Sequence, residues 1–264
     1  MNDGSISDIE CLMQRSQVHP QWQEILAEAL TTLDPDYLKS LLLDDSWLPG
    51  SNQLLAAFKR ERSGVRYLLI GESPYPRRES ANGIAFYDAA VGSLWSEQGL
   101  SKPVNRATSL RNIMKTALLA EGLLDKDADG KIPQSRIAAI DKRGLIQTLD
   151  ELFANLQQAG LLMLNATPVL HPKRKPVLEA RFWHAFLAQL LTSIAEQATE
   201  QITLLLWGKI AQQVEAMPAS KTYRKIVCEH PYNLSFIDNP QMQDLFADLS
   251  PLQQRQTPAP PANR

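Results

Sequence analysis

Short, continuously apolar segments recur along the chain, and each is followed by a polar residue or a glycine. Such runs are typical of strands that are buried on both faces of a parallel sheet. We predict strands at 67–70, 161–164, 202–207 and 225–228. Apolar residues at helical spacing predict helices between them, at 109–121, 144–158 and 182–198. This alternation predicts an α/β fold, a three-layer α/β/α arrangement with a central, mostly parallel four-stranded sheet.

The residues before the first predicted strand carry a helical pattern. Apolar residues recur at helical spacing from Trp22 to Leu33, and Asp34-Pro35 marks a turn before the next stripe. A short helix at 52–60 should lead into the main domain. We therefore expect an N-terminal helical extension at 1–45, a main domain at 46–250 and a disordered, Pro-rich tail at 251–264.

The composition is that of an ordinary globular protein, since 44% of the 264 residues are hydrophobic and the net charge is −2. Cys11 and Cys228 stand alone, without the spacing of a disulfide framework or a zinc site. No apolar run is long enough to span a bilayer and the start lacks a signal-peptide pattern, so we expect a cytoplasmic protein without a membrane partner. The slight acidity disfavours nucleic acid without excluding it, because phosphate contacts are local.

Polar residues and residues of special geometry follow each predicted strand. Parallel sheets bind ligands beyond the carboxyl ends of their strands. The segments expected to meet at that edge are 71–76, 165–168, 208–209 and 230–233.

These strand ends resemble motifs of the uracil-DNA glycosylases. Members of family 1 carry, in this order, GQDPYH, GLAF, PSLKN, LLLN, LLWG and HPSPLS. The corresponding segments here are GESPYP at 71–76, GIAF at 83–86, TSLRN at 108–112, LMLN at 162–165, LLWG at 205–208 and HPYNLS at 230–235. The resemblance runs from about Trp47 to Phe246, with what looks like an insertion at 123–142. It implies the fold of that family and the removal of uracil from DNA.

The resemblance also implies a pocket for one base flipped out of DNA. Phe86 would stack on the base. Asn165 would read its edge, because an amide offers both a donor and an acceptor to O4 and N3–H of uracil. Tyr75 would exclude the methyl group of thymine. His230 would donate a hydrogen bond to O2 of the departing base, where negative charge develops.

A DNA-binding surface around the pocket is implied in the same way. Leu234 matches an apolar wedge that fills the space left by the flipped base. Further DNA contacts are implied for Ser109, Lys209, Ser235 and Pro74. Outside the motifs, the run Lys173-Arg174-Lys175 would attract phosphates, or else belong to an ordinary solvated loop. His171 is a reserve catalytic candidate, for which a structural role is the simpler interpretation.

One departure from the family concerns catalysis. The Asp of GQDPYH positions the attacking water and stabilises the cationic sugar, but Ser73 stands there, and a serine without an activating partner is neither charged nor a good base. Glu72 is adjacent, yet it should point away because neighbouring side chains of an extended segment leave on opposite faces. It would substitute only in a rearranged turn. The catalytic candidates are therefore His230, Ser73 and Glu72, and we expect reduced or altered activity.

Three functions remain open at this point. The first is a divergent glycosylase that hydrolyses the N-glycosidic bond of uracil, or of another altered base, in single- or double-stranded DNA. The second is a catalytically inactive relative that binds DNA or a base. The third is a Rossmann-like domain for a nucleotide or a protein, which the lack of a GxGxxG or Walker loop disfavours.

We expect a monomer without a metal ion or an organic cofactor. The Asp-rich segment at 125–130 lacks the closing Glu of a calcium loop and is interpreted as a solvated turn.

Overall fold

The computed structural model describes residues 3–255, which are built around a sheet of four parallel strands. The strands are β1 (Tyr67–Gly71), β4 (Leu161–Asn165), β5 (Thr203–Trp207) and β6 (Arg224–Cys228). Their order is β4-β1-β5-β6, so the chain adds β4 on one side of β1 and then β5 and β6 on the other. The carboxyl ends around β1 are thus the switch point where sheets of this kind bind ligands. The four predicted strands and the parallel sheet are confirmed.

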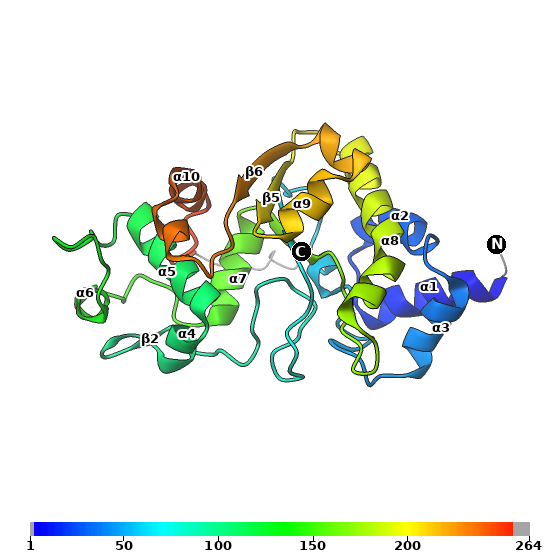
Figure 1. Ribbon diagram of the computed structural model, residues 1–264, viewed down its shortest axis with the longest axis horizontal. Helices are drawn as coiled ribbons and strands as arrows, with labels where there is room; N and C mark the ends of the chain where they lie inside the picture. Colours follow the sequence, from blue (N-terminus) through cyan, green and yellow to red (C-terminus); the bar gives the residue numbers. More distant parts are fainter. Residues whose placement is uncertain (1–2, 256–264) are drawn as a thin grey trace, which may run out of the picture.

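Side chains of the sheet alternate between two cores, one on each face. In β1, Leu68 and Ile70 belong to the first core and Leu69 to the second, as the pleat of a strand requires. The first core is covered by α1 (Asp3–Arg15), α2 (Pro20–Leu30), α3 (Pro35–Leu43), α8 (Pro176–Glu196) and α9 (Ile210–Glu215). The second is covered by α4 (Lys102–Arg106), α5 (Thr108–Ala120), α6 (Gln134–Ala139), α7 (Leu149–Gln158) and α10 (Pro240–Leu249). The two sets of helices flank the sheet in Figure 1, which confirms the three-layer arrangement.

The N-terminal helices are an integral part of the first core. α2 packs along α8, and its buried residues share one cluster with Leu68 and Ile70 of the sheet. Local sequence explains where α3 begins: Pro35 occupies the first turn, where its missing N–H costs nothing, and Asp34 accepts a hydrogen bond from the N–H of Tyr37 (2.9 Å). The predicted extension is helical, but it shares its core with the main domain.

A capping box makes α7 begin later than the sequence pattern predicted. The helix expected at 144–158 begins only at Leu149. Thr148 precedes it and accepts a hydrogen bond from the N–H of Glu151 (3.3 Å), while the carboxylate of Glu151 accepts one from the N–H of Thr148 (2.8 Å). These reciprocal bonds satisfy two free donors at the helix start and so fix it there.

Other elements are shifted or were not predicted. The helix expected at 182–198 begins already at Pro176, and only the 3-10 turn η1 (Ala56–Phe58) forms within 52–60. The unpredicted elements include the hairpin of β2 (Trp95–Ser96) and β3 (Gly99–Leu100), the turns η2 (Pro218–Thr222) and η3 (Leu234–Asp238), and the helices α4, α6, α9 and α10. Most of these are too short to show a period in the sequence.

The chain stays in the fold beyond residue 250. Leu252 is 0% exposed; its N–H donates to the carboxylate of Glu121 (2.8 Å) and its carbonyl accepts from the N–H of Ile146 (2.9 Å). The predicted tail therefore does not begin at 251. Its remainder, 256–264, lies outside the described residues. Across residues 3–255, the helices are all too short or too polar to cross a membrane.

Residues 123–142, the expected insertion, pack against the turn η3 and the β2–β3 hairpin. Asp127 accepts hydrogen bonds from two backbone N–H groups of its own turn, so the Asp-rich segment is a turn. Gln134 of α6 accepts from the N–H of Leu100 (2.8 Å). Lys126 forms an ion pair with Asp238, the last residue of η3. This ion pair links the segment to the turn that begins at Leu234.

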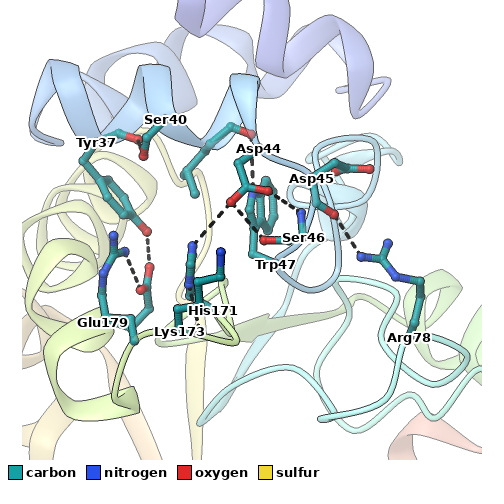
Figure 2. A network of polar contacts seen from close by, with 12 residues as sticks. Tyr37, Ser40, Asp44, Asp45, Ser46, Trp47, Arg78, His171, Lys173 and Glu179 are labelled. Atoms are coloured by element: carbon teal, nitrogen blue, oxygen red, sulfur yellow. Dashed lines mark hydrogen bonds and ion pairs between the residues drawn. The ribbon is translucent and has the colours of Figure 1, made fainter.

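A buried polar network joins α3 to the start of α8 (Figure 2). The hydroxyl of Tyr37 donates to the carboxylate of Glu179, which also accepts from Arg174 (2.7 Å). The indole N–H of Trp183 donates to the oxygen of Tyr37 (2.8 Å). Burial, followed by the hydrogen bond to Glu179, raises the pKa of Tyr37, so this hydroxyl remains a donor. The network joins the N-terminal layer to the loop that follows β4, because Arg174 belongs to that loop.

Replacing Glu179 by alanine should destabilise the protein strongly. The Glu179 side chain is 1% exposed, and its loss leaves the buried hydroxyl of Tyr37 and the guanidinium of Arg174 without their partner. Removing one member of a buried ion pair costs about 3–5 kcal/mol. Urea unfolding followed by circular dichroism measures the change. The matched control is Asp141→Ala, which breaks an exposed pair with Arg143 and should leave the unfolding midpoint unchanged.

Candidate active site

The ends of β1 and β4 lie side by side, where Gly71 pairs with Asn165. A Cβ atom on Gly71 would lie 2.9 Å from Cβ of Ala85 and 3.1 Å from Oδ1 of Asn165. Only glycine therefore allows the amide of Asn165 and the segment before Phe86 to meet at this edge. Asn165 itself is 7% exposed.

Phe86 is held in an uncommon backbone conformation beside His230. Its φ is +63°, in the left-handed region that a bulky residue rarely adopts. Its ring centroid lies 5.3 Å from that of Trp207, edge to face, and 5.6 Å from that of His230. The hydroxyl of Tyr75 donates to the carbonyl of Phe86 (3.4 Å). Such strain persists where the surroundings impose it, which is common at ligand sites.

Tyr75 is half-buried next to an ion pair. Burial and then the nearby carboxylate of Asp88 raise the pKa of Tyr75 to about 12, so its hydroxyl remains protonated at neutral pH. Asp88 is 5% exposed and bonds Arg77 at 3.0 Å. This pair ties the GESPYP turn to the segment that follows Phe86. Asp88 and Arg77 were not singled out from the sequence, since neither lies in a quoted motif.

His230 packs directly on the glycine that ends β5. A Cβ atom on Gly208 would lie 2.8 Å from Cβ of His230, and the φ of Gly208 is +78°. The N–H of Tyr232 donates to Nδ1 of His230 (3.1 Å), so the neutral ring carries its proton on Nε2. Burial lowers the pKa of His230, which favours this neutral form, and the carboxylate of Glu72 raises it by a smaller amount.

Glu72 and Ser73 follow β1 at the same edge. Glu72 is exposed and Ser73 is half-buried. The carboxylate of Glu72 raises the pKa of His230, by less than burial lowers it, while the expectation that Glu72 points away stays a prediction. The alternation of side chains holds within β1, which ends at Gly71, and Glu72 lies in the turn beyond it.

Replacing Glu72 by glutamine should lower the pKa of His230 further. The carboxylate stabilises the charged imidazolium, and the amide of glutamine does not. An NMR titration of the His230 ring protons measures the shift. Replacement of Glu97, an exposed carboxylate beyond β2, by glutamine is the control and should leave the titration unchanged. An unchanged pKa in Glu72→Gln would show that the carboxylate does not face the ring.

The loop from His230 to Leu234 is anchored by a residue whose role the sequence did not reveal. Asn112 of α5 is 0% exposed, and its amide nitrogen donates to the carbonyl of Pro231 (2.8 Å) and lies 3.3 Å from that of Asn233. Asn112 belongs to the TSLRN motif. A buried amide on the apolar face of a helix was the available signal, because such a group needs a partner.

The residues predicted to contact DNA differ in how exposed they are to solvent. Leu234 is 68% exposed at the start of η3, and Ser235 is exposed beside it. Lys209 is exposed after β5, and Ser109 is half-buried in the first turn of α5. Pro74 is buried, so its ring is not available to DNA in this conformation.

The basic run after β4 is partly committed to structure. Arg174 bonds Glu179 and lies over the rings of Tyr37 (5.4 Å) and Phe182 (5.1 Å). Lys173 and Lys175 are exposed. The expectation of three cations for phosphates is thereby reduced to two.

The N-terminal layer also contacts the loop that follows β4 and the segment that follows the GESPYP turn, as Figure 2 shows. His171 lies 3.8 Å from Asp44, its Nδ1 accepts from the N–H of Lys173 (3.1 Å), and Arg78 donates to the carbonyl of Asp45 (2.9 Å). These contacts give His171 a structural role. Within residues 3–255, no three His, Cys, Asp or Glu side chains gather as ligands for a metal ion.

The fold and the site together define a three-layer α/β domain with an aromatic ring, an imidazole and an amide at one sheet edge. A sequence profile described as the uracil DNA glycosylase superfamily matches residues 58–250. The chain belongs to this superfamily.

Known relatives agree with this membership. A uracil-DNA glycosylase of Corynebacterium glutamicum is 25% identical over 202 residues, which cover 75% of this chain and 74% of that protein. One of Acinetobacter baylyi is 24% identical over 230 residues, or 84% and 82% of the two chains. The crystal structure of the wild-type UNG from Nitratifractor salsuginis superposes with a TM-score of 0.90 at 37% identity, over 97% of this chain and 100% of that one. Mimivirus uracil-DNA glycosylase shares the fold, with a TM-score of 0.53 at 18% identity.

Proposed function

We propose that this protein removes uracil from DNA by hydrolysis of the N-glycosidic bond. The observation that carries the proposal is the neighbourhood of Phe86 and His230, 5.6 Å apart, at the edge where Asn165 ends β4. An aromatic face, an amide and a neutral imidazole are the groups needed to stack a flipped pyrimidine, read its edge and stabilise it as it leaves. Membership of the superfamily supports the same reaction.

In the proposed reaction, the oxygen of a water molecule forms a bond to C1′ of the deoxyribose while the bond from C1′ to N1 of uracil breaks. The electron pair leaves with the base as an anion. The Nε2–H of neutral His230 donates to O2 of that anion, which is most negative in the transition state. The water gives up a proton to a carboxylate, and this proton then passes to the base. The products are therefore free uracil and an abasic site.

We propose that Glu72 supplies this carboxylate in place of the missing Asp. Ser73 carries no charge, whereas Glu72, the residue before it, is a carboxylate at the same edge and raises the pKa of His230. A negative charge beside His230 would also stabilise the cationic sugar. Because the carboxylate comes from a different backbone position, we expect a rate below that of an enzyme with the Asp.

Ser73 favours one other candidate, a catalytically inactive protein that binds DNA or a base. The deciding experiment incubates the chain, in excess, with labelled single-stranded and duplex oligonucleotides containing one uracil, followed by alkaline cleavage at abasic sites. Cleavage supports the glycosylase, and a thymine oligonucleotide is the matched control. If uracil and a panel of altered bases all survive while Ser73→Asp cleaves, the inactive binder is correct.

A further inference from the structure

The loop between β6 and η3 carries a second exposed apolar side chain beside the expected wedge. Leu234 is 68% exposed and Tyr232 is 66% exposed. A single exposed apolar residue needs no explanation, but here two lie within three positions of one segment. Both border the site, because the same segment includes His230.

The exposure of Tyr232 does not come from a loose loop. Its N–H donates to Nδ1 of His230 (3.1 Å), and the N–H of Asn233 donates to the carbonyl of His230 (2.9 Å). The buried amide of Asn112 donates a hydrogen bond to the carbonyl of Pro231 (2.8 Å). The backbone is fixed on both sides of Tyr232, so the ring is presented at a defined place. A tyrosine presented in this way supplies contact area at a small cost in conformational entropy.

We propose that Tyr232 is a base-stacking residue, which takes the face of the nucleobase next to the extruded nucleotide. The inference rests on the proposed function, since extrusion is what uncovers that face. An aliphatic side chain such as Leu234 fills a gap, but it does not match the π face of a base as a ring does. Residues 230–235 contain no Lys or Arg, so this loop offers no cation for a phosphate. Besides Leu234 and the hydroxyl of Ser235, the ring is therefore the group of this segment suited to DNA.

The test measures DNA binding separately from chemistry. Fluorescence anisotropy with a single-stranded oligonucleotide carrying one 2′-fluoro-deoxyuridine, which resists hydrolysis, gives the dissociation constants of the unaltered chain, Tyr232→Ala and Tyr232→Phe. We expect Tyr232→Ala to bind about tenfold more weakly, equivalent to about 1.4 kcal/mol and within the range for stacking on an aromatic side chain. Tyr232→Phe should bind like the unaltered chain. Equal loss in both variants would assign the contact to the hydroxyl and overturn stacking.

A 2-aminopurine placed next to the modified uridine gives a second readout. Stacking quenches its fluorescence, so the unaltered chain and Tyr232→Phe should leave it dimmer than Tyr232→Ala does. Equal affinity and equal fluorescence for the unaltered chain and Tyr232→Ala would refute the proposal.

The two proposals fail in different ways. If Tyr232→Ala weakens binding but the unaltered chain never releases uracil, the stacking role stands and the glycosylase is wrong. If uracil is released and Tyr232→Ala changes neither readout, the glycosylase stands and the stacking role is wrong. Absence of DNA binding by the unaltered chain overturns both.

Discussion

Replacing Glu72 by glutamine should lower the rate of uracil excision about 100-fold or more, whereas Ser73→Ala should leave it nearly unchanged. Glutamine keeps the size of the side chain and removes its charge, so the loss isolates the electrostatic contribution to the transition state. Single-turnover excision from a single-stranded uracil oligonucleotide, with enzyme in excess, measures the chemical step.

The two variants discriminate between the catalytic candidates of the GESPYP turn. A large loss in Ser73→Ala with little change in Glu72→Gln would assign the chemistry to the serine and reject Glu72 as the carboxylate. Binding to the 2′-fluoro-deoxyuridine oligonucleotide should be retained in both, which shows that the pocket is intact. Glu97→Gln again serves as the exposed control and should keep full activity.

The strands could be predicted because burial on both faces leaves a simple signal. Residues 67–70 and 161–164 are continuously apolar, since alternate side chains enter one core or the other. The β2–β3 hairpin left no such signal, because Trp95 and Ser96 are its only two residues on one strand. The start of α7 was within reach of the sequence, as Thr148 and Glu151 have the spacing of a capping box.

The convergence of the candidate residues could be predicted from topology, but their local partners could not. Parallel strands bring Gly71 and Asn165 to one edge, whatever the loops between them. The contacts of Tyr37 with Arg174 and Glu179 depend on how α3 docks against α8, which no local pattern records. The sequence therefore indicated three cations available for phosphates, whereas Arg174 is paired with Glu179 in the fold.

Glu72 lies just beyond the point where the strand's alternation rule applies. The period of two applies to residues inside a ladder, and β1 ends at Gly71. Beyond that point the backbone turns, and the side-chain direction is set by packing against the neighbouring strand ends. Functional residues at the ends of strands lie in this region, so their orientation requires coordinates.

We expect the second large effect from Asn165→Asp, which should reduce uracil excision by about 100- to 1000-fold. The amide of Asn165, which is 7% exposed, would donate to O4 and accept from N3–H of uracil. A carboxylate replaces the donor by a second acceptor, so two oxygens face each other where a hydrogen bond stood, and a charge is buried as well. A lost hydrogen bond and an unsatisfied buried group together cost about 3–4 kcal/mol, which corresponds to that factor.

Two readouts separate this loss of base reading from loss of folding. The circular dichroism spectrum should not change, because Asn165 pairs with Gly71 through the backbone and aspartate has nearly the same shape. A cytosine oligonucleotide should be a relatively better substrate for the variant than for the unaltered chain, since its exocyclic amino group is a donor that a carboxylate accepts. Full retention of uracil excision in Asn165→Asp would mean that this amide does not read the base, and that other groups of the site select the substrate.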